Sequence, residues 1–447
     1  MPELVHEVTD LLQHLIRNAC VNDGTEASGQ EVRNADLLQS YLEPAGVAMQ
    51  RYEPLPGRGN LLARIEGSDP TAPSLMLMGH MDVVPVNAAN WREDPFGGEL
   101  IDGEVWGRGA IDMLNLTSSM AVAFRRLAEE GFRPRGTLSF LGVADEEALG
   151  THGAKWLTEN AAEDVRADYL VTETGGFRMP LGSGGPKLPV SVAEKGTYWC
   201  RIRVTGTAGH ASMPFRTDNA LIKAAEIVKR LAEYRPEAVI HDTWRGFVEG
   251  LELPGPFATA LLDPDAIIEF CEGLAETDLG IARFLHASAH TTFAPTVVHG
   301  GVKTNVIPDE VEVQVDIRTL PGDTAESVRA QLAAALGDLY EDDLIVADSN
   351  DLASASPTQT PLWDVLQSAA SSLVPGAQNV PFMIVGATDA RYWRRIGTVS
   401  YGYGLFSETM DMKDFFSMFH GDNEKVDVGS LDLTTQLWLR LARSFWD

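Results

Sequence analysis

The sequence predicts an α/β protein, in which a mainly parallel sheet with helices on both faces carries an inserted α+β domain with an antiparallel sheet. Continuous apolar runs alternate with helical periodicities over roughly the first 175 residues, which is typical of a parallel sheet covered on both faces. Two later runs, 198–204 and 311–318, alternate apolar and polar side chains, which is typical of antiparallel strands with one wet face. A chain of 447 residues is also too long for one compact core.

The first part of the chain has the pattern of a buried sheet. Apolar residues at helical spacing over 4–16 predict an amphipathic helix that packs on a core. Strands are predicted over 60–66, 74–78, 137–144 and 168–172, and a helix over 117–130 that is closed by Gly131. We therefore expect strands and helices to alternate as they do in doubly covered sheets.

The middle of the chain has a different pattern. Each alternating strand precedes a predicted helix, at 219–234 and at 324–339, which indicates a small α+β domain inserted into the first. The stretch 235–299 is rich in Pro, Gly and Asp, and we interpret it as an irregular elaboration of that insert. After about Ser349 the earlier pattern returns, with a strand at 382–385 and a final helix ending near Trp446. The expected domains are a first domain formed by 1–196 and 349–447, and an inserted domain over 197–348.

Composition restricts the class of protein. A formal net charge of −29 argues against nucleic acid as a partner, since nucleic-acid binders need a basic face, and an acidic surface binds anionic membranes poorly. No apolar run approaches the roughly 20 residues of a membrane span, and the first residues do not have the pattern of a secretory signal. Three scattered cysteines fit a reducing compartment. We expect a cytoplasmic protein without a membrane or nucleic-acid partner.

Polar side chains follow three separate predicted strands at the point where each ends. These are His80, the pair Glu146 and Glu147, and Glu173. A single histidine after a strand is more often structural, and two adjacent carboxylates are more often a solvated turn. Ligands gather at the carboxyl ends of strands in open α/β sheets, so three such coincidences favour one shared site.

Three further residues can complete a metal site. Asp82 lies two residues beyond His80 and can fix the tautomer of that imidazole, although a turn or helix cap would explain it too. Asp112 ends a loop containing glycines, and its two oxygens could bridge two cations. His420 lies in a polar loop, where a histidine taken alone is more often simply exposed. It becomes a candidate ligand because the cluster otherwise lacks a second imidazole. Such a mixed N/O set suits zinc, and also manganese or cobalt.

Nine segments together resemble the aminoacylase/carboxypeptidase family of co-catalytic zinc exopeptidases. That family includes acetylornithine deacetylases, succinyl-diaminopimelate desuccinylases, glutamate carboxypeptidases and carnosine-type dipeptidases. The later segments are most similar to the branch containing carboxypeptidase S and the N-fatty-acyl-amino-acid hydrolases. The nine segments span 79–85, 106–112, 145–147, 172–176, 194–196, 209–214, 304–308, 386–391 and 420–424, and they cover nearly the whole chain in the family's order.

The resemblance implies that 1–196 and 349–447 form the catalytic domain and that 197–348 form a lid and dimerisation domain, and it implies a role for each site residue. Two divalent metal ions, zinc by preference, would be held by His80 and Glu173 on one side and by Glu147 and His420 on the other, with Asp112 bridging. Glu146 would be the general base and Asp82 the partner of His80, while His210 of the lid would stabilise the reacting carbonyl, commonly across a homodimer. Substrate-binding roles fall on Asn305, Arg318, Thr388 and Asp389. For Arg318, an exposed strand residue in a salt bridge is the alternative.

The chain departs from the family after the bridging aspartate. That branch usually has an acidic residue and then lysine there, whereas this chain has Met113 and Leu114, followed by Asn115. The ligand is kept but the neighbouring charge is lost, which bears on metal affinity and on the polarity of the pocket.

The expected function is hydrolysis of N-acyl amino acids or small peptides that carry a free C-terminal carboxylate. A metal-bridged hydroxide would be the nucleophile, with Glu146 as general base. One alternative is a dipeptidase or aminopeptidase that requires a free substrate amine and uses a further acidic residue. The other is a catalytically inactive binding homologue, which the presence of the base and all five ligands disfavours.

Overall fold

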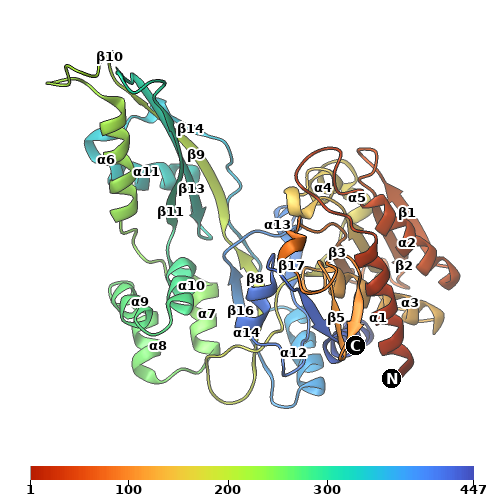
Figure 1. The fold of residues 1–447 in the computed structure, drawn as a ribbon. Coiled ribbons are helices and arrows are strands. Elements are labelled where there is room, and N and C mark those ends of the chain that lie inside the picture. The colour runs from red at the N-terminus through yellow and green to blue at the C-terminus, as the bar shows by residue number, and fades with distance from the viewer. Residues whose placement is uncertain (1) are drawn as a thin grey trace.

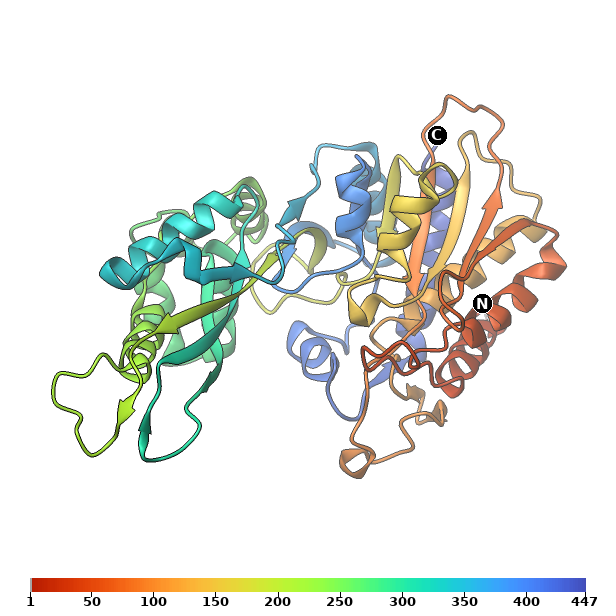
Figure 2. The ribbon, with the colours of Figure 1, turned by 90° about the horizontal axis from the view of Figure 1, so that it is seen from above.

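The computed structural model describes residues 2–447 and has two lobes (Figures 1 and 2). The main lobe contains both termini and is built around a nine-stranded sheet, while the second lobe is built around a four-stranded sheet. The chain leaves the main lobe after β8 (Lys187–Glu194) and enters the second lobe along β9 (Gly196–Thr205). The two lobes are therefore connected by the middle of the chain rather than by its ends.

The nine-stranded sheet combines parallel pairs at its centre and between β8 and β16 with antiparallel pairs elsewhere. Its order is β1-β2-β6-β3-β7-β17-β8-β15, with β16 also paired to β8. β3 runs parallel to both β6 and β7, and β17 runs parallel to β7. The other strands of this sheet are β1 (Ala48–Tyr52), β2 (Asn60–Ile65), β3 (Leu75–His80), β6 (Leu138–Val143), β7 (Tyr169–Thr172), β15 (Ser354–Ala355), β16 (Gln378–Ile384) and β17 (Val399–Gly402). The predicted mainly parallel sheet is confirmed.

Helices cover both faces of this sheet. Successive side chains of a strand point to opposite faces, so Leu75 and Leu77 of β3 join one core cluster and Met76 and Met78 join another. The first face is covered by α1 (Pro2–Arg17), α2 (Val32–Leu42), α3 (Leu114–Glu129), α12 (Pro361–Leu373) and α15 (Val428–Ser444). The second face is covered by α4 (Ala154–Asn160), α5 (Ala162–Val165) and α13 (Ala390–Arg395). Burial on both faces explains why the central strands are continuously apolar.

The second lobe is an antiparallel sheet with helices on one face. Its order is β11-β13-β9-β14, with β11 (Thr292–Gly300), β13 (Glu310–Thr319) and β14 (Ile345–Ala347). Alternate residues of β13 are buried against α6 (Ala220–Glu233) and α11 (Ala325–Leu336), which gives the lobe its own core. At the far tip, β10 (Gly209–His210) pairs with β12 (Val306–Ile307). The predicted α+β insert with an antiparallel sheet is confirmed, whereas the domain limits at 196/197 and 348/349 stay a prediction.

The stretch 235–299 is helical, so our interpretation of it as irregular is wrong. It forms α7 (Asp242–Gly250), α8 (Gly255–Leu261), α9 (Ile267–Ala275) and α10 (Leu279–Ala289) before entering β11. These helices join the main core: Phe247 and Phe284 lie 6.1 and 5.3 Å from Phe382 of β16, between ring centroids. Short helices interrupted by Pro and Gly give too few turns for a clear periodicity, which is why the sequence pattern concealed them.

A buried lysine connects the segment between β8 and β9 to the end of α10. Lys195 lies between β8 and β9, and its ammonium donates to the carbonyls of Ala287 (2.8 Å) and His290 (2.6 Å) at the end of α10. This side chain thereby connects the segment that enters β9 with the segment that enters β11.

A small sheet lies beside the main one and connects distant parts of the sequence. Its order is β18-β5-β4, formed by β4 (Glu99–Ile101), β5 (Glu104–Trp106) and β18 (Lys425–Asp427), and α14 (Met412–Met418) precedes β18. Among the described residues, no helix has the length and apolar character needed to cross a membrane.

Candidate metal centre

The residues of the candidate centre come from neighbouring strands of the main sheet. His80 is the last residue of β3, Glu173 directly follows β7, and Glu146 and Glu147 open a short turn just after β6. Since β6, β3 and β7 are adjacent and parallel, their carboxyl ends meet at one edge.

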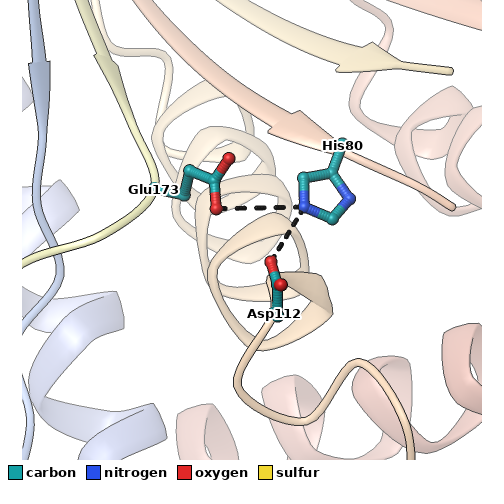
Figure 3. A group of neighbouring side chains, drawn as sticks. All are labelled: His80, Asp112 and Glu173. Atoms are coloured by element: carbon teal, nitrogen blue, oxygen red, sulfur yellow. Dashed lines mark hydrogen bonds and ion pairs between the residues drawn. The ribbon is translucent and has the colours of Figure 1, made fainter. Parts of the chain in front are cut away.

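The first ligand group is buried and consists of His80, Asp112 and Glu173 (Figure 3). Nε2 of His80 lies 3.1 Å from Oδ1 of Asp112 and 4.0 Å from Oε2 of Glu173. The side chains converge from β3, from the loop before α3 and from the segment after β7. Their ligand atoms all lie within 4.8 Å of one another, a spacing that one cation could span.

The second ligand group shares Asp112 with the first. Nε2 of His420 lies 3.0 Å from Oδ2 of Asp112 and 3.1 Å from Oε2 of Glu147. The His420 side chain is 49% exposed, so this group opens toward solvent while the first is closed. Asp112 thus offers one oxygen to each group, which is the arrangement a bridging carboxylate requires.

Asp82 holds the turn after β6 rather than contacting His80 through its carboxylate. Its Oδ1 accepts from the backbone N–H of Glu146 (3.2 Å), and its Oδ2 accepts from that of Glu147 (3.1 Å). The imidazole Nδ1 of His80 lies 3.0 Å from the backbone oxygen of Asp82 but 3.6 Å from Oδ1. The tautomer of His80 is therefore fixed by a carbonyl, which needs N–H at Nδ1 and leaves Nε2 to the ligand group.

The electrostatics of the two groups suit cations. Hydrogen bonds that His420 donates to Asp112 and to Glu147 raise the pKa of His420 to about 10. Burial raises the pKa of Glu147 to about 8, with repulsion from Asp112, and burial followed by repulsion from Glu146 raises that of Glu173 well above its usual range. For Asp112, burial opposes ionisation, but hydrogen bonds from His420 and His80 hold its pKa below the usual range.

These residues fit two divalent cations on the chemistry of their donors. More carboxylates than imidazoles crowd the buried space, and such an excess of negative charge is stabilised by paired cations or metals. Within the described chain, Oε1 of Glu147 is buried without a hydrogen-bond partner. Imidazole nitrogen with carboxylate oxygen is a donor set that zinc, manganese and cobalt accept.

Glu146 lies beside the two groups without belonging to either. Burial raises its pKa to about 8, repulsion from Asp389 adds to the increase, and His80 and Arg391 oppose it. Asp389 is 2% exposed, and neither carboxylate oxygen has a hydrogen-bond partner among the described residues. Burial raises the pKa of Asp389 to about 7. Glu146 and Asp389 thus form a pair of buried carboxylates next to the ligands.

The structure does not bring the expected lid residues to these groups. His210 is exposed at the tip of the second lobe, where its Nδ1 lies 2.7 Å from Oγ of Ser212, and Asn305 is exposed on the adjoining loop. Arg318 forms a two-point ion pair with Asp316, at 2.7 and 3.0 Å, which is the structural alternative considered for it. Their roles in substrate binding stay predictions.

Thr388 precedes Asp389, and its backbone groups are already hydrogen-bonded within the protein. Its backbone N–H donates to the carboxylate of Glu194, and its carbonyl accepts from Arg391. Thr388 is 4% exposed. A substrate-binding role for Thr388 stays a prediction.

Sequence reasoning missed several residues that support the centre. Asn22 donates to both Asp82 (2.9 Å) and Asp145 (3.1 Å) from its one amide nitrogen. Arg108 and Glu424 form a fully buried ion pair at 2.8 Å behind Asp112. No local pattern identifies Asn22, whereas Glu424 stands within the 420–424 segment. The thioether of Met113 accepts from the backbone N–H of His80 (3.3 Å), so this departure from the family packs against a ligand.

Comparisons with known proteins agree with this geometry. The sequence pattern of peptidase family M20/M25/M40 matches residues 76–444, and the chain belongs to that family. The N-fatty-acyl-amino acid synthase/hydrolase PM20D1 of Bos taurus is 30% identical over 383 residues, which are 83% of this chain and 74% of that protein.

Solved structures share the fold over the whole chain. An M20 family metallo-carboxypeptidase, Sso-CP2 from Sulfolobus solfataricus, has a TM-score of 0.69 at 16% identity and covers 100% of this chain and 99% of its own. The YXEP protein of Bacillus subtilis, described as a dinuclear metal binding peptidase of the M20 family, has a TM-score of 0.60 at 14% identity, with 97% of each chain covered. The protein is therefore a metallohydrolase that acts on amide bonds.

Proposed function

We propose that this chain hydrolyses N-acyl amino acids or small peptides with a free C-terminal carboxylate at a centre of two divalent metal ions. The observation that carries the proposal is the sharing of Asp112 between two ligand groups, each with its own imidazole. The relative named N-fatty-acyl-amino acid synthase/hydrolase supports N-acyl amino acids as the substrate class. We propose zinc as the native metal, with cobalt or manganese as substitutes that the same donors accept.

The protein residues divide the work of the reaction. His80, Asp112 and Glu173 would hold one ion, and Asp112, Glu147 and His420 the other. The bound ions would polarise the amide carbonyl and acidify a water molecule. Glu146 takes the proton of the attacking water and returns it to the leaving amine nitrogen. The carboxylate of Asp82 accepts a hydrogen bond from each backbone N–H of Glu146 and Glu147, which would hold the turn that carries them in a fixed orientation.

The proposed role of Glu146 can be tested by an isosteric change. Glu146→Gln keeps the volume of the side chain but cannot accept a proton, and general acid–base catalysis typically contributes about 10²- to 10⁴-fold. Amine release from an N-acyl amino acid should fall by that range while elemental analysis still finds two metal ions. Glu159→Gln, an exposed change on α4, is the matched control. Near-normal turnover in the Glu146 variant would remove it as the base.

A requirement for a free substrate amine is the second candidate function. Asp389 favours it, because its buried carboxylate beside Glu146 has no hydrogen-bond partner among the described residues and could bind an ammonium group. If so, Asp389→Asn should lower turnover of unblocked dipeptides while sparing their acetylated forms. If acetylated substrates are preferred by the unchanged chain, this candidate is excluded.

We also propose that residues 197–348 act as a lid and dimerise. The segments that follow β10 and precede β12 at the tip of the second lobe expose Met213 (70%), Phe215 (83%) and Val302 (92%). An exposed apolar patch of this kind suits contact with another copy of the chain, which could bring His210 to the reacting carbonyl. Light scattering should give a dimer for the unchanged chain and a monomer for Phe215→Asp.

We also propose a cytoplasmic location. The three cysteines are free and buried, which suits a reducing compartment.

A further inference from the structure

We propose that Glu424 and Arg108 form a bracket that positions Asp112 relative to His420 and so sets the affinity of the second cation group. Neither side chain is offered as a ligand, so both are positioning residues. The inference rests on the proposed two-metal function.

The carboxylate of Glu424 is surrounded by hydrogen-bond donors from the Asp112 loop. Oε1 accepts from the backbone N–H groups of Ile111 (2.6 Å) and Asp112 (3.0 Å). Both oxygens lie 3.1 Å from the N–H of Gly109, and Oε2 accepts from Nη1 of Arg108 at 2.8 Å. The side chain of Glu424 is fully buried. Every group that contacts the Glu424 carboxylate is a hydrogen-bond donor, so both side-chain oxygens must act as acceptors. A glutamine side chain at this position would turn its NH2 group toward a donor and could not satisfy both sides.

The same two residues also hold the loop that carries His420. Glu424 lies four residues after His420, and Nη2 of Arg108 donates to the carbonyl of His420 at 3.3 Å. The backbone continues this connection, since the N–H of Gly107 donates to the carbonyl of Glu424 at 2.9 Å. The next residues pair as β5 and β18, with Lys425 opposite Trp106. Backbone pairing therefore sets the register of β5 against β18. The bracket sets the distance between the loop that carries Asp112 and the loop that carries His420.

His420 needs such support more than the other ligands do. It is half exposed and has a left-handed backbone conformation, with φ of +56°. Its ring stacks on Phe419 of the same loop, at 5.1 Å between centroids. By contrast, His80 belongs to a buried strand and is held by its neighbours. Loss of the bracket should thus weaken the group of Asp112, Glu147 and His420 more than the group of His80, Asp112 and Glu173.

A purely structural role for the buried pair would have a different signature. A buried ion pair can contribute to stability without affecting any ligand, and its removal would then lower only the melting temperature. A positioning role changes the affinity for the second cation in protein that is still folded. The affinity for cobalt separates the two roles and does not depend on turnover.

The test is a cobalt titration of metal-free protein, followed by visible absorption and elemental analysis, with circular dichroism to verify folding. For Glu424→Gln we expect the first equivalent to bind nearly as in the unchanged chain and the second to bind about 10- to 100-fold more weakly. Glu104→Gln is the matched control, because it removes the half-buried partner of Lys425 from the same small sheet without touching either ligand loop. We expect it to bind both equivalents normally.

A folded Glu424→Gln protein with an unchanged second affinity would overturn the bracket. If that variant does not fold, Arg108→Lys keeps the Glu424 carboxylate and its backbone bonds but loses the contact to His420. It should weaken the second equivalent by about tenfold, and an unchanged affinity there would also overturn the bracket. Fewer than two equivalents in the unchanged chain would remove the proposed function and the bracket with it. Two equivalents bound with the same affinities by both proteins would remove only the bracket.

Discussion

Asp82→Asn should disable the centre without removing any metal ligand. The carboxylate accepts from Glu146 N–H (3.2 Å) on one oxygen, and from Glu147 N–H (3.1 Å) and Asn22 (2.9 Å) on the other. Asparagine has one acceptor oxygen, so its amide group must face at least one of these donors. The least costly orientation keeps the bonds from Glu147 N–H and Asn22 and loses the bond from the N–H of Glu146, the proposed base.

The size of the effect follows from that single bond. A hydrogen bond to a charged group contributes about 1.5–3 kcal/mol, and about 1.4 kcal/mol corresponds to a factor of ten. We therefore expect kcat/KM for an N-acyl amino acid to fall about 10- to 150-fold, measured by amine release in metal-saturated protein. Asp36→Asn, which removes an exposed partner of Arg51, should leave turnover unchanged. A fall of less than about threefold in the Asp82 variant would refute the proposed role of this carboxylate.

Three further changes have distinct expected outcomes. His420→Ala should reduce bound metal from two ions per chain to one by elemental analysis, and two retained ions would show that this imidazole is no ligand. Phe382→Ala should lower the free energy of unfolding in urea by about 3–5 kcal/mol, because this ring packs α7 and α10 onto the main core, while the half-exposed Phe257→Ala should cost far less; equal costs would contradict that packing. Burial lowers the pKa of Lys195 to about 7, so the folded chain binds fewer protons than the unfolded chain from about pH 7 to 10. The unfolding free energy of the unchanged chain should therefore rise relative to that of Lys195→Met by up to about 1.4 kcal/mol per pH unit in that window, and a constant difference would contradict it.

The sheet at the centre of the molecule could be predicted because its strands are buried on both faces. β3, β6 and β7 read as continuous apolar runs, and a polar residue marks the end of each. That combination identifies both the fold class and the edge where the ligands lie. The alternation in β13 likewise predicted a sheet with one exposed face, which the structure has.

The helices α7 to α10 could not be predicted from periodicity. Each has between 7 and 11 residues, and Pro254 and Gly255 interrupt the run between two of them. Their place on β16 depends on packing among aromatic rings far apart in the sequence. Such long-range packing leaves no local signal.

The supports of the centre escaped prediction for a related reason. Glu424 and the Asp112 loop are separated by more than 300 residues, and the carboxylate contacts backbone N–H groups rather than a recognisable side chain. Asn22 acts through a single amide nitrogen shared between two carboxylates. Contacts to the backbone do not depend on the identity of the residue contacted, so sequence patterns rarely reveal them.

The most direct test of hydrolysis by a two-cation centre is the turnover of metal-free protein as zinc is added back. Amine release from an N-acyl amino acid should be absent in the chelated chain and return as two equivalents of zinc are bound per chain. Asp112→Asn, which removes the shared ligand, should recover neither the stoichiometry nor the turnover. Full turnover in the continued presence of a strong chelator, or at a single bound equivalent, would contradict catalysis by a bridged pair.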